Sequence, residues 1–229
     1  APSLFCDVNG DYRGSDGEIH RGANFKNYTT FSLWDTYRAA HPLATLIHPE
    51  ETKDWAATFI AMQKEQGYLP IWPLMGCETN CMVGSPAVSV LADMCLKGFV
   101  KDKEAAYQAM TASMKYDFRG IPLLNKYGYI PFDSEENETV AKNLENYIAA
   151  WSLAQVAKQM GKQKDYTYYM GLSSNYKKLY DQRVGFFRAV STKGEVRDTT
   201  GFNPRFHTTD YTEGNPWQYL WLVPQDVNG

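Results

Sequence analysis

From Phe31 onward, apolar residues recur at steps of three and four, which is the period of amphipathic helices. Short loops that carry Gly or Pro separate these periodic segments from one another. No alternating series of polar and apolar residues of any length is present, so a strand-rich fold is not expected. The pattern predicts an all-α fold over residues 31–229.

The apolar positions also place the individual helices. Most of them are bounded by a Gly or Pro at one end. The expected helices begin at Phe31, span Glu50–Gln66, follow Pro86 to near Gly98, carry Tyr107 through Phe118, carry Val140 through Gly161, run from about Asp165 to Tyr180, and follow Pro216.

Residues 1–30 have a different character and are expected to form an irregular or β-hairpin lead-in. Turn-forming residues dominate two stretches, Asp7–Asp11 and Gly14–Gly17, with only short apolar pieces between them. The first stretch is rich in Asp but lacks the closing Glu of an EF-hand at the proper spacing. Turns are therefore preferred over a calcium loop.

The length and composition allow one domain, residues 1–229, with a large core, because 44% of the 229 residues are hydrophobic. Long and short helices joined by polar, aromatic loops suggest antiparallel helix pairs around a common axis, with function on one rim. About seven helices are too few to close a twelve-helix (α/α)6 toroid. We expect the chain to be the N-terminal portion of such a toroid and to be incomplete.

Charge and residue usage exclude several kinds of partner. A formal net charge of -3 is not that of a nucleic-acid binder. No apolar run approaches the roughly 18 residues that span a bilayer, so no membrane span is expected. The four Cys and four His do not fall at the spacing of a zinc site, so no metal ligands are predicted, and a disulfide stays open.

The segment Asp210–Tyr219 has the composition of a sugar-binding loop. Glu213 lies there among aromatic rings and amides, with Asn215 and Trp217 nearby. Ring faces stack on the C–H face of a pyranose, amides fix its hydroxyls, and a carboxyl group shielded from water can hold a raised pKa and donate a proton. Glu213 is therefore the leading candidate for a general acid. The alternative is a simple helix start, with Asn215 as the cap.

Two further segments hold candidate substrate-binding residues. Asp35 lies near a helix start, where the helix dipole keeps its carboxylate ionised, and it follows Trp34. Glu78 lies in the middle of a long loop. Each has a structural alternative: Asp35 could simply pair with Arg38 along the helix, and Glu78 could anchor its loop.

Taken together, several segments resemble glycoside hydrolase family 92, the exo-acting α-mannosidases. The resemblance extends over essentially the whole chain. Its segments are FSLWDT at 31–36, RAAHPL at 38–43, LPIWPL at 69–74, AD at 92–93 with KG at 97–98, DYTEGN at 210–215 with WQY at 217–219, and VPQD at 223–226.

The resemblance implies calcium-dependent hydrolysis of terminal α-mannosides with inversion, α-1,2-linked or related, by a toroid that follows a β-sandwich domain. Glu213 would be the general acid, and Asp35 would bind the cleaved mannose with Trp34 and Glu78 beside it. The substrate would be a mannose-containing glycan outside the cell or in the periplasm. An inverting enzyme also needs a carboxylate base about 6.5–9.5 Å from the acid.

The chain departs from the family pattern in extent. The sandwich is not among its residues, nor are the downstream motifs His-Gly-Asn-Glu-Pro and Gly-Asn-Asp-Asp, which in the family supply the base and metal contacts. We therefore expect residues 1–229 alone to hold the acid half of a site without turning over substrate. The alternative function is a non-catalytic carbohydrate-binding or scaffold protein built on an incomplete helical toroid.

Overall fold

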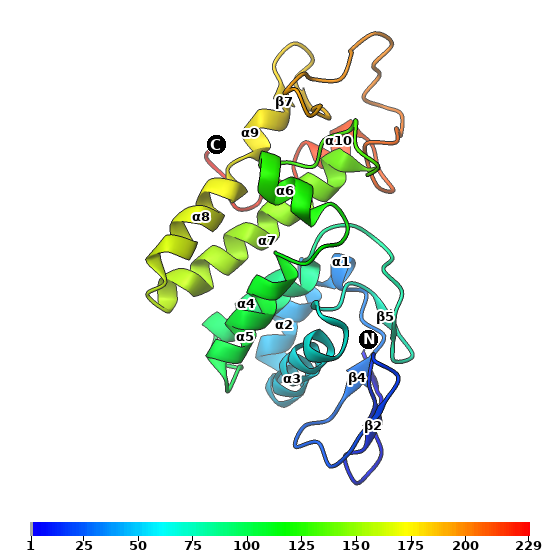
Figure 1. Cartoon of the computed structure of the whole chain (residues 1–229), viewed down its shortest axis with the longest axis vertical. Coiled ribbons are helices and arrows are strands. Elements are labelled where there is room, and N and C mark those ends of the chain that lie inside the picture. Colours follow the sequence, from blue (N-terminus) through cyan, green and yellow to red (C-terminus); the bar gives the residue numbers. More distant parts are fainter. Residues whose placement is uncertain (1) are drawn as a thin grey trace.

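The computed structural model describes residues 2–229, and its regular elements are mainly helices (Figure 1). The helices are α1 (Leu33–Thr36), α2 (Ala40–Ile47), α3 (Pro49–Gln66), α4 (Pro86–Leu96), α5 (Lys103–Ser113), α6 (Ile121–Tyr127), α7 (Thr139–Gln159), α8 (Gln163–Ser173), α9 (Tyr176–Leu179) and α10 (Pro216–Tyr219). The helical fold class expected for residues 31–229 is confirmed at this level. Among the described residues, no helix has the length and apolar character needed to cross a bilayer.

Within residues 2–229, the strands are all two residues long and form four antiparallel pairs. They are β1 (Ser3–Leu4) with β4 (Tyr28–Thr29), β2 (Tyr12–Arg13) with β3 (Ile19–His20), β5 (Pro73–Leu74) with β6 (Cys77–Glu78), and β7 (Tyr180–Asp181) with β8 (Phe186–Phe187). Before residue 31, β2 and β3 form a hairpin, while β1 and β4 pair from the two ends of this segment. All four cysteines are free thiols.

Helix α7 is the central element of the fold. Its apolar residues surround the helix axis, and nearly all of its side chains are buried, as is typical of a core helix. Helix α8 lies alongside it on one side and α4 packs against it on another (Figure 1). Six polar residues of α7 are buried as well. Four of them form hydrogen bonds with residues 34–38, 85 and 130–137: Glu145, Asn146, Asn143 and Lys142.

Three expected helices differ in extent. The fourth ends at Ser113, not at Phe118, and the chain turns over residues 114–120, where Arg119 and Gly120 are left-handed, before α6 begins at Ile121. The helix expected from Phe31 is divided into α1 and α2. The one expected to reach Tyr180 is interrupted after Ser173, so that α9 is separate from α8. The predicted domain limits remain a prediction.

Candidate functional site

The Asp210–Tyr219 segment is fixed to the core on both sides of Glu213. Upstream, the backbone carbonyl of Asp210 accepts hydrogen bonds from the first residues of α7, Val140 (3.1 Å) and Ala141 (3.2 Å). Downstream, the hydroxyl of buried Tyr219 donates to the Thr212 carbonyl at 2.6 Å. These anchors satisfy helix N–H groups and fix the loop between them.

Glu213 itself adopts a left-handed backbone conformation with φ 45°, which is uncommon for a residue with a Cβ. Such backbone conformations cluster at functional sites when the surrounding structure imposes them. Its side chain is exposed. The shielding of the carboxyl group from water that the sequence suggested is therefore not provided by residues 2–229.

A small pocket brings Glu213 together with Trp34, although the two residues come from opposite ends of the chain. Trp34 and Arg38 contribute from the first helical segment, and the loop around Glu213 contributes the other wall. The pocket is lined by Trp34, Arg38, Thr212, Glu213, Gly214, Gln218, Tyr219 and Leu222. It therefore combines aromatic surface, a guanidinium group, an amide and one carboxylate.

Glu145 of α7 holds the Trp34 wall of this pocket in place. Its buried carboxylate accepts hydrogen bonds from Trp34 Nε1 (3.1 Å), the Tyr37 hydroxyl (2.9 Å) and an Arg38 guanidinium nitrogen (2.7 Å). Because the indole N–H of Trp34 is engaged here, the part of Trp34 free to contact a ligand is its ring surface. Ring surfaces stack on sugars through their C–H faces.

Two opposing effects act on the Glu145 carboxyl group. Burial penalises its charged form, while the Arg38 charge and the three hydrogen bonds favour that form, and burial is the larger effect. The result raises the pKa of Glu145 to about 7. A carboxyl group that changes charge near neutral pH thus connects α7 to one wall of the pocket.

Helical periodicity gave no signal for the burial of Glu145. Thr139, Lys142, Asn143 and Asn146 recur beside it at steps of three and four, as on a solvent-facing side, yet all of them are buried in the structure. A buried carboxylate requires several hydrogen-bond donors. The donors lie more than a hundred residues earlier in the chain, so their identity could not be read from local spacing.

The other predicted residues of the Asp210–Tyr219 segment have structural partners. Asn215 caps α10: its side chain accepts from the Gln218 N–H, and the Gln218 side chain accepts from the Asn215 N–H. This is the capping arrangement considered as the alternative. The Trp217 ring packs edge-on against Phe186, with ring centroids 4.7 Å apart, and is half exposed. Sugar binding by Asn215 and Trp217 stays a prediction.

Asp35 and Glu78 are not among the residues that line the pocket. The exposed carboxylate of Asp35 accepts a hydrogen bond from the Ser32 hydroxyl. The carboxylate of Glu78 accepts backbone N–H groups of Ile71 (2.7 Å), Trp72 (2.9 Å) and Asn80 (2.9 Å). Glu78 thus anchors its own loop, and a role for either residue in sugar binding stays a prediction.

The residues of 2–229 that line this pocket do not form a calcium site. Calcium takes six to eight oxygen ligands, usually with several carboxylates among them. Among residues 2–229, Glu213 is the single carboxylate that lines the pocket. The calcium implied by the resemblance would have to find most of its ligands elsewhere.

A helical domain with an aromatic pocket and a loop carboxylate is the architecture of a class of carbohydrate-active proteins. The chain belongs to glycosyl hydrolase family 92, because the model of that family's catalytic domain matches residues 1–229. The family resemblance of the sequence segments is thereby confirmed. A comparison with curated proteins gave no significant match.

Solved structures of family members share the fold. The family GH92 alpha-mannosidase BT3965 from Bacteroides thetaiotaomicron is 41% identical with a TM-score of 0.91, over 97% of this chain and 30% of that one. Its complex with mannoimidazole gives 40% identity and a TM-score of 0.91, with the same coverage. The inverting mannosidase BT2199 from the same organism is 34% identical with a TM-score of 0.84, over 95% and 30% of the two chains. The chain thus spans about a third of these proteins.

Proposed function

We propose that the protein hydrolyses terminal, non-reducing α-mannosides, α-1,2-linked or related, and that the pocket of Trp34 and Glu213 belongs to its active site. The observation that carries this proposal is the meeting of these two residues in one pocket from opposite ends of the chain. The named relatives support the substrate class, because they are mannosidases and one of them binds mannoimidazole. A mannose-containing glycan is the proposed partner.

In this proposal Glu213 is the general acid. It donates its proton to the glycosidic oxygen as the bond to the anomeric carbon breaks, and a base removes a proton from the water that attacks the opposite face of the sugar. The attack inverts the anomeric centre, as expected for a relative of the inverting enzyme BT2199. Trp34 would pack against the mannose, while Asp35, Glu78, Asn215 and Trp217 remain secondary binding candidates.

The proposal assigns the remaining parts of the site to residues outside 2–229. The pocket lining holds one carboxylate, whereas an inverting mechanism uses two. We assign to those residues the base, most calcium ligands and the surface that covers Glu213. We also propose that the helices described here form part of an (α/α)6 toroid next to a β-sandwich domain, in a protein that acts outside the cell or in the periplasm.

Glu213→Gln tests the acid in the complete protein. A general acid contributes about 10²- to 10⁴-fold to the rate, so kcat/KM on an α-mannobioside should fall by about that factor. A mannoside with a dinitrophenolate leaving group needs little protonation, so its hydrolysis should fall far less. Both rates are measured by mannose release under identical conditions.

Glu195→Gln is the matched control, because Glu195 is an exposed glutamate in a loop of the same C-terminal region. It should leave both rates unchanged. Equal losses on the two mannosides after Glu213→Gln, or no loss on either, would remove Glu213 from the acid role. Mannose binding without any hydrolysis by the complete unmodified protein would instead support the carbohydrate-binding alternative.

A further inference from the structure

We propose that Asp16, His20 and Glu65 form a binding site for a divalent transition-metal ion, of which zinc is the best fit. The three residues lie outside the pocket of Trp34 and Glu213. Asp16 and His20 belong to the β2–β3 hairpin, and Glu65 comes from the last turn of α3. A bound ion would therefore fasten the N-terminal hairpin to the helical core, and this role is independent of the proposed catalysis.

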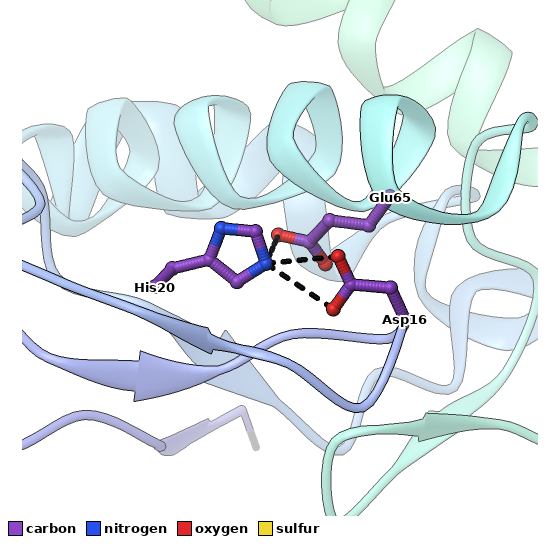
Figure 2. Close-up of side chains that lie close together, drawn as sticks. All are labelled: Asp16, His20 and Glu65. Atoms are coloured by element: carbon purple, nitrogen blue, oxygen red, sulfur yellow. Dashed lines mark hydrogen bonds and ion pairs between the residues drawn. The ribbon is translucent and has the colours of Figure 1, made fainter.

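The ligand atoms already lie at metal-site separations. One ligand atom from each residue can be chosen so that all three lie within 4.8 Å of one another. His20 Nε2 is 3.0 Å from Asp16 Oδ2 and 3.8 Å from Glu65 Oε1, and Figure 2 shows that it faces both carboxylates. Ligands on a tetrahedral zinc ion at 2.0–2.2 Å are about 3.4 Å apart, between those two values.

A second set of contacts holds the ligands in this orientation. Only 4% of the Glu65 side chain is exposed. Its Oε1 accepts from the Tyr12 hydroxyl at 2.8 Å, and its Oε2 accepts from the backbone N–H (2.8 Å) and hydroxyl (2.9 Å) of Ser15. The His20 ring stacks on Tyr12 with an interplanar angle of 14°. Metal ligands are characteristically oriented by such outer hydrogen bonds.

The backbone next to the cluster leaves room at the point where the ligands meet. A Cβ at Gly14 would lie 2.6 Å from both Asp16 Oδ1 and His20 Nε2. Any other residue at this position would therefore push the imidazole and the carboxylate apart. The absence of a side chain here is an observation independent of the ligand types, and it favours their convergence.

The ligand types select the metal. One imidazole and two carboxylates suit zinc and similar transition-metal ions, whereas calcium and magnesium prefer oxygen ligands alone. Two carboxylates neutralise the charge of a divalent ion when the imidazole is neutral. His20 and Glu65 also line a groove between the hairpin and α3, which gives an ion a path from solvent.

The alternative is an ionic cluster in which a protonated His20 pairs with the carboxylates and no metal binds. Isothermal titration of the purified, metal-free protein with zinc chloride at pH 7.5 separates the two, with thermal unfolding as a second readout. A metal site predicts saturable binding of one zinc ion and a higher Tm in zinc. Any rise in Tm that calcium or magnesium causes at the same concentration should persist in His20→Ala, because these ions prefer oxygen ligands and do not need the imidazole.

Variants assign the signal to the cluster. His20→Ala should weaken this binding event at least tenfold, and Asp16→Asn should do so while keeping the residue's shape. Tyr12→Phe, which removes the outer hydrogen bond to Glu65, should weaken zinc binding about 10- to 100-fold. His48→Ala is the matched control, because His48 lies 3.9 Å from the Glu51 carboxylate but, within residues 2–229, belongs to no group of three metal-ligating side chains.

Three outcomes would overturn the proposal. Zinc could leave Tm and the heat of titration unchanged, which would identify the ionic cluster. Zinc could bind His20→Ala and Asp16→Asn as tightly as the unmodified protein, which would place the ion elsewhere, for instance on the exposed thiols of Cys77 and Cys81. Calcium could raise Tm in the unmodified protein but not in His20→Ala, which would place calcium in the cluster and contradict the ligand chemistry.

Discussion

Replacing Glu145 with Gln should change how the stability of the fold depends on pH. The substitution removes the ionisable group but keeps an oxygen that can accept from Trp34 and Arg38. The amide nitrogen replaces the oxygen that accepts the Tyr37 hydroxyl, and it can donate to that hydroxyl once the latter rotates. The packing of the pocket wall is therefore preserved while the titration is lost.

The size of the effect follows from the raised pKa. The pKa of Glu145 is about 7 in the folded protein, against an ordinary value of 4.5. Between these two values the unfolded chain has lost the proton that the folded protein still holds, so raising the pH destabilises the fold. From pH 5 to pH 8 the free energy of unfolding should fall by about 2.5 kcal/mol through this group.

The assay is urea unfolding of the unmodified protein and of Glu145→Gln at pH 5, 6, 7 and 8. The difference between the two proteins cancels every other titrating group. The unmodified protein should lose about 2.5 kcal/mol relative to the variant across this range. A constant difference would show that Glu145 ionises in the folded protein as it does in the unfolded chain, and would refute the reasoning from burial.

Two further predictions concern packing and a buried histidine. Gly84→Ala should destabilise the fold by at least about 2 kcal/mol more than Gly98→Ala. Both glycines have positive φ, but only at Gly84 would an added Cβ lie 2.4 Å from the Cβ of Glu145. Equal losses in urea unfolding would argue against this contact. Burial lowers the pKa of His41 to about 4, so the folded protein excludes a proton that the unfolded chain binds. Acidification from pH 7 to pH 5 should then cost the unmodified protein about 2 kcal/mol relative to His41→Phe, and parallel pH curves in the same assay would contradict it.

The helical core could be predicted because its helices carry their own signals. Trp55, Phe59 and Met62 are buried on one face of α3, and Gly67 ends that helix in a left-handed conformation, as the sequence indicated. The same period continued past Ser113 to Phe118, yet the chain turns there and the Phe118 ring is exposed. Periodicity reports which residues could share a face, and it does not report whether a neighbour covers that face.

Part of the candidate pocket could be anticipated from composition. Aromatic and carboxylate side chains singled out Trp34 and Glu213, and the structure places both at one pocket. Glu145 and Glu65 could not be found in this way, because each is defined by partners far away in the sequence. A carboxylate acquires such a role only when the tertiary fold supplies its donors.

The connection of both pocket walls to α7 has a consequence for biosynthesis. One wall reaches α7 through Glu145, which closes a loop of more than a hundred residues, and the other reaches it through Asp210 near the opposite end. Contacts between residues far apart in the sequence cost the most conformational entropy to form, because they close long loops, and they slow folding. Trp34 therefore leaves the ribosome before the residues that complete its wall, and in that interval its ring belongs to the exposed apolar surface that makes folding intermediates prone to aggregate.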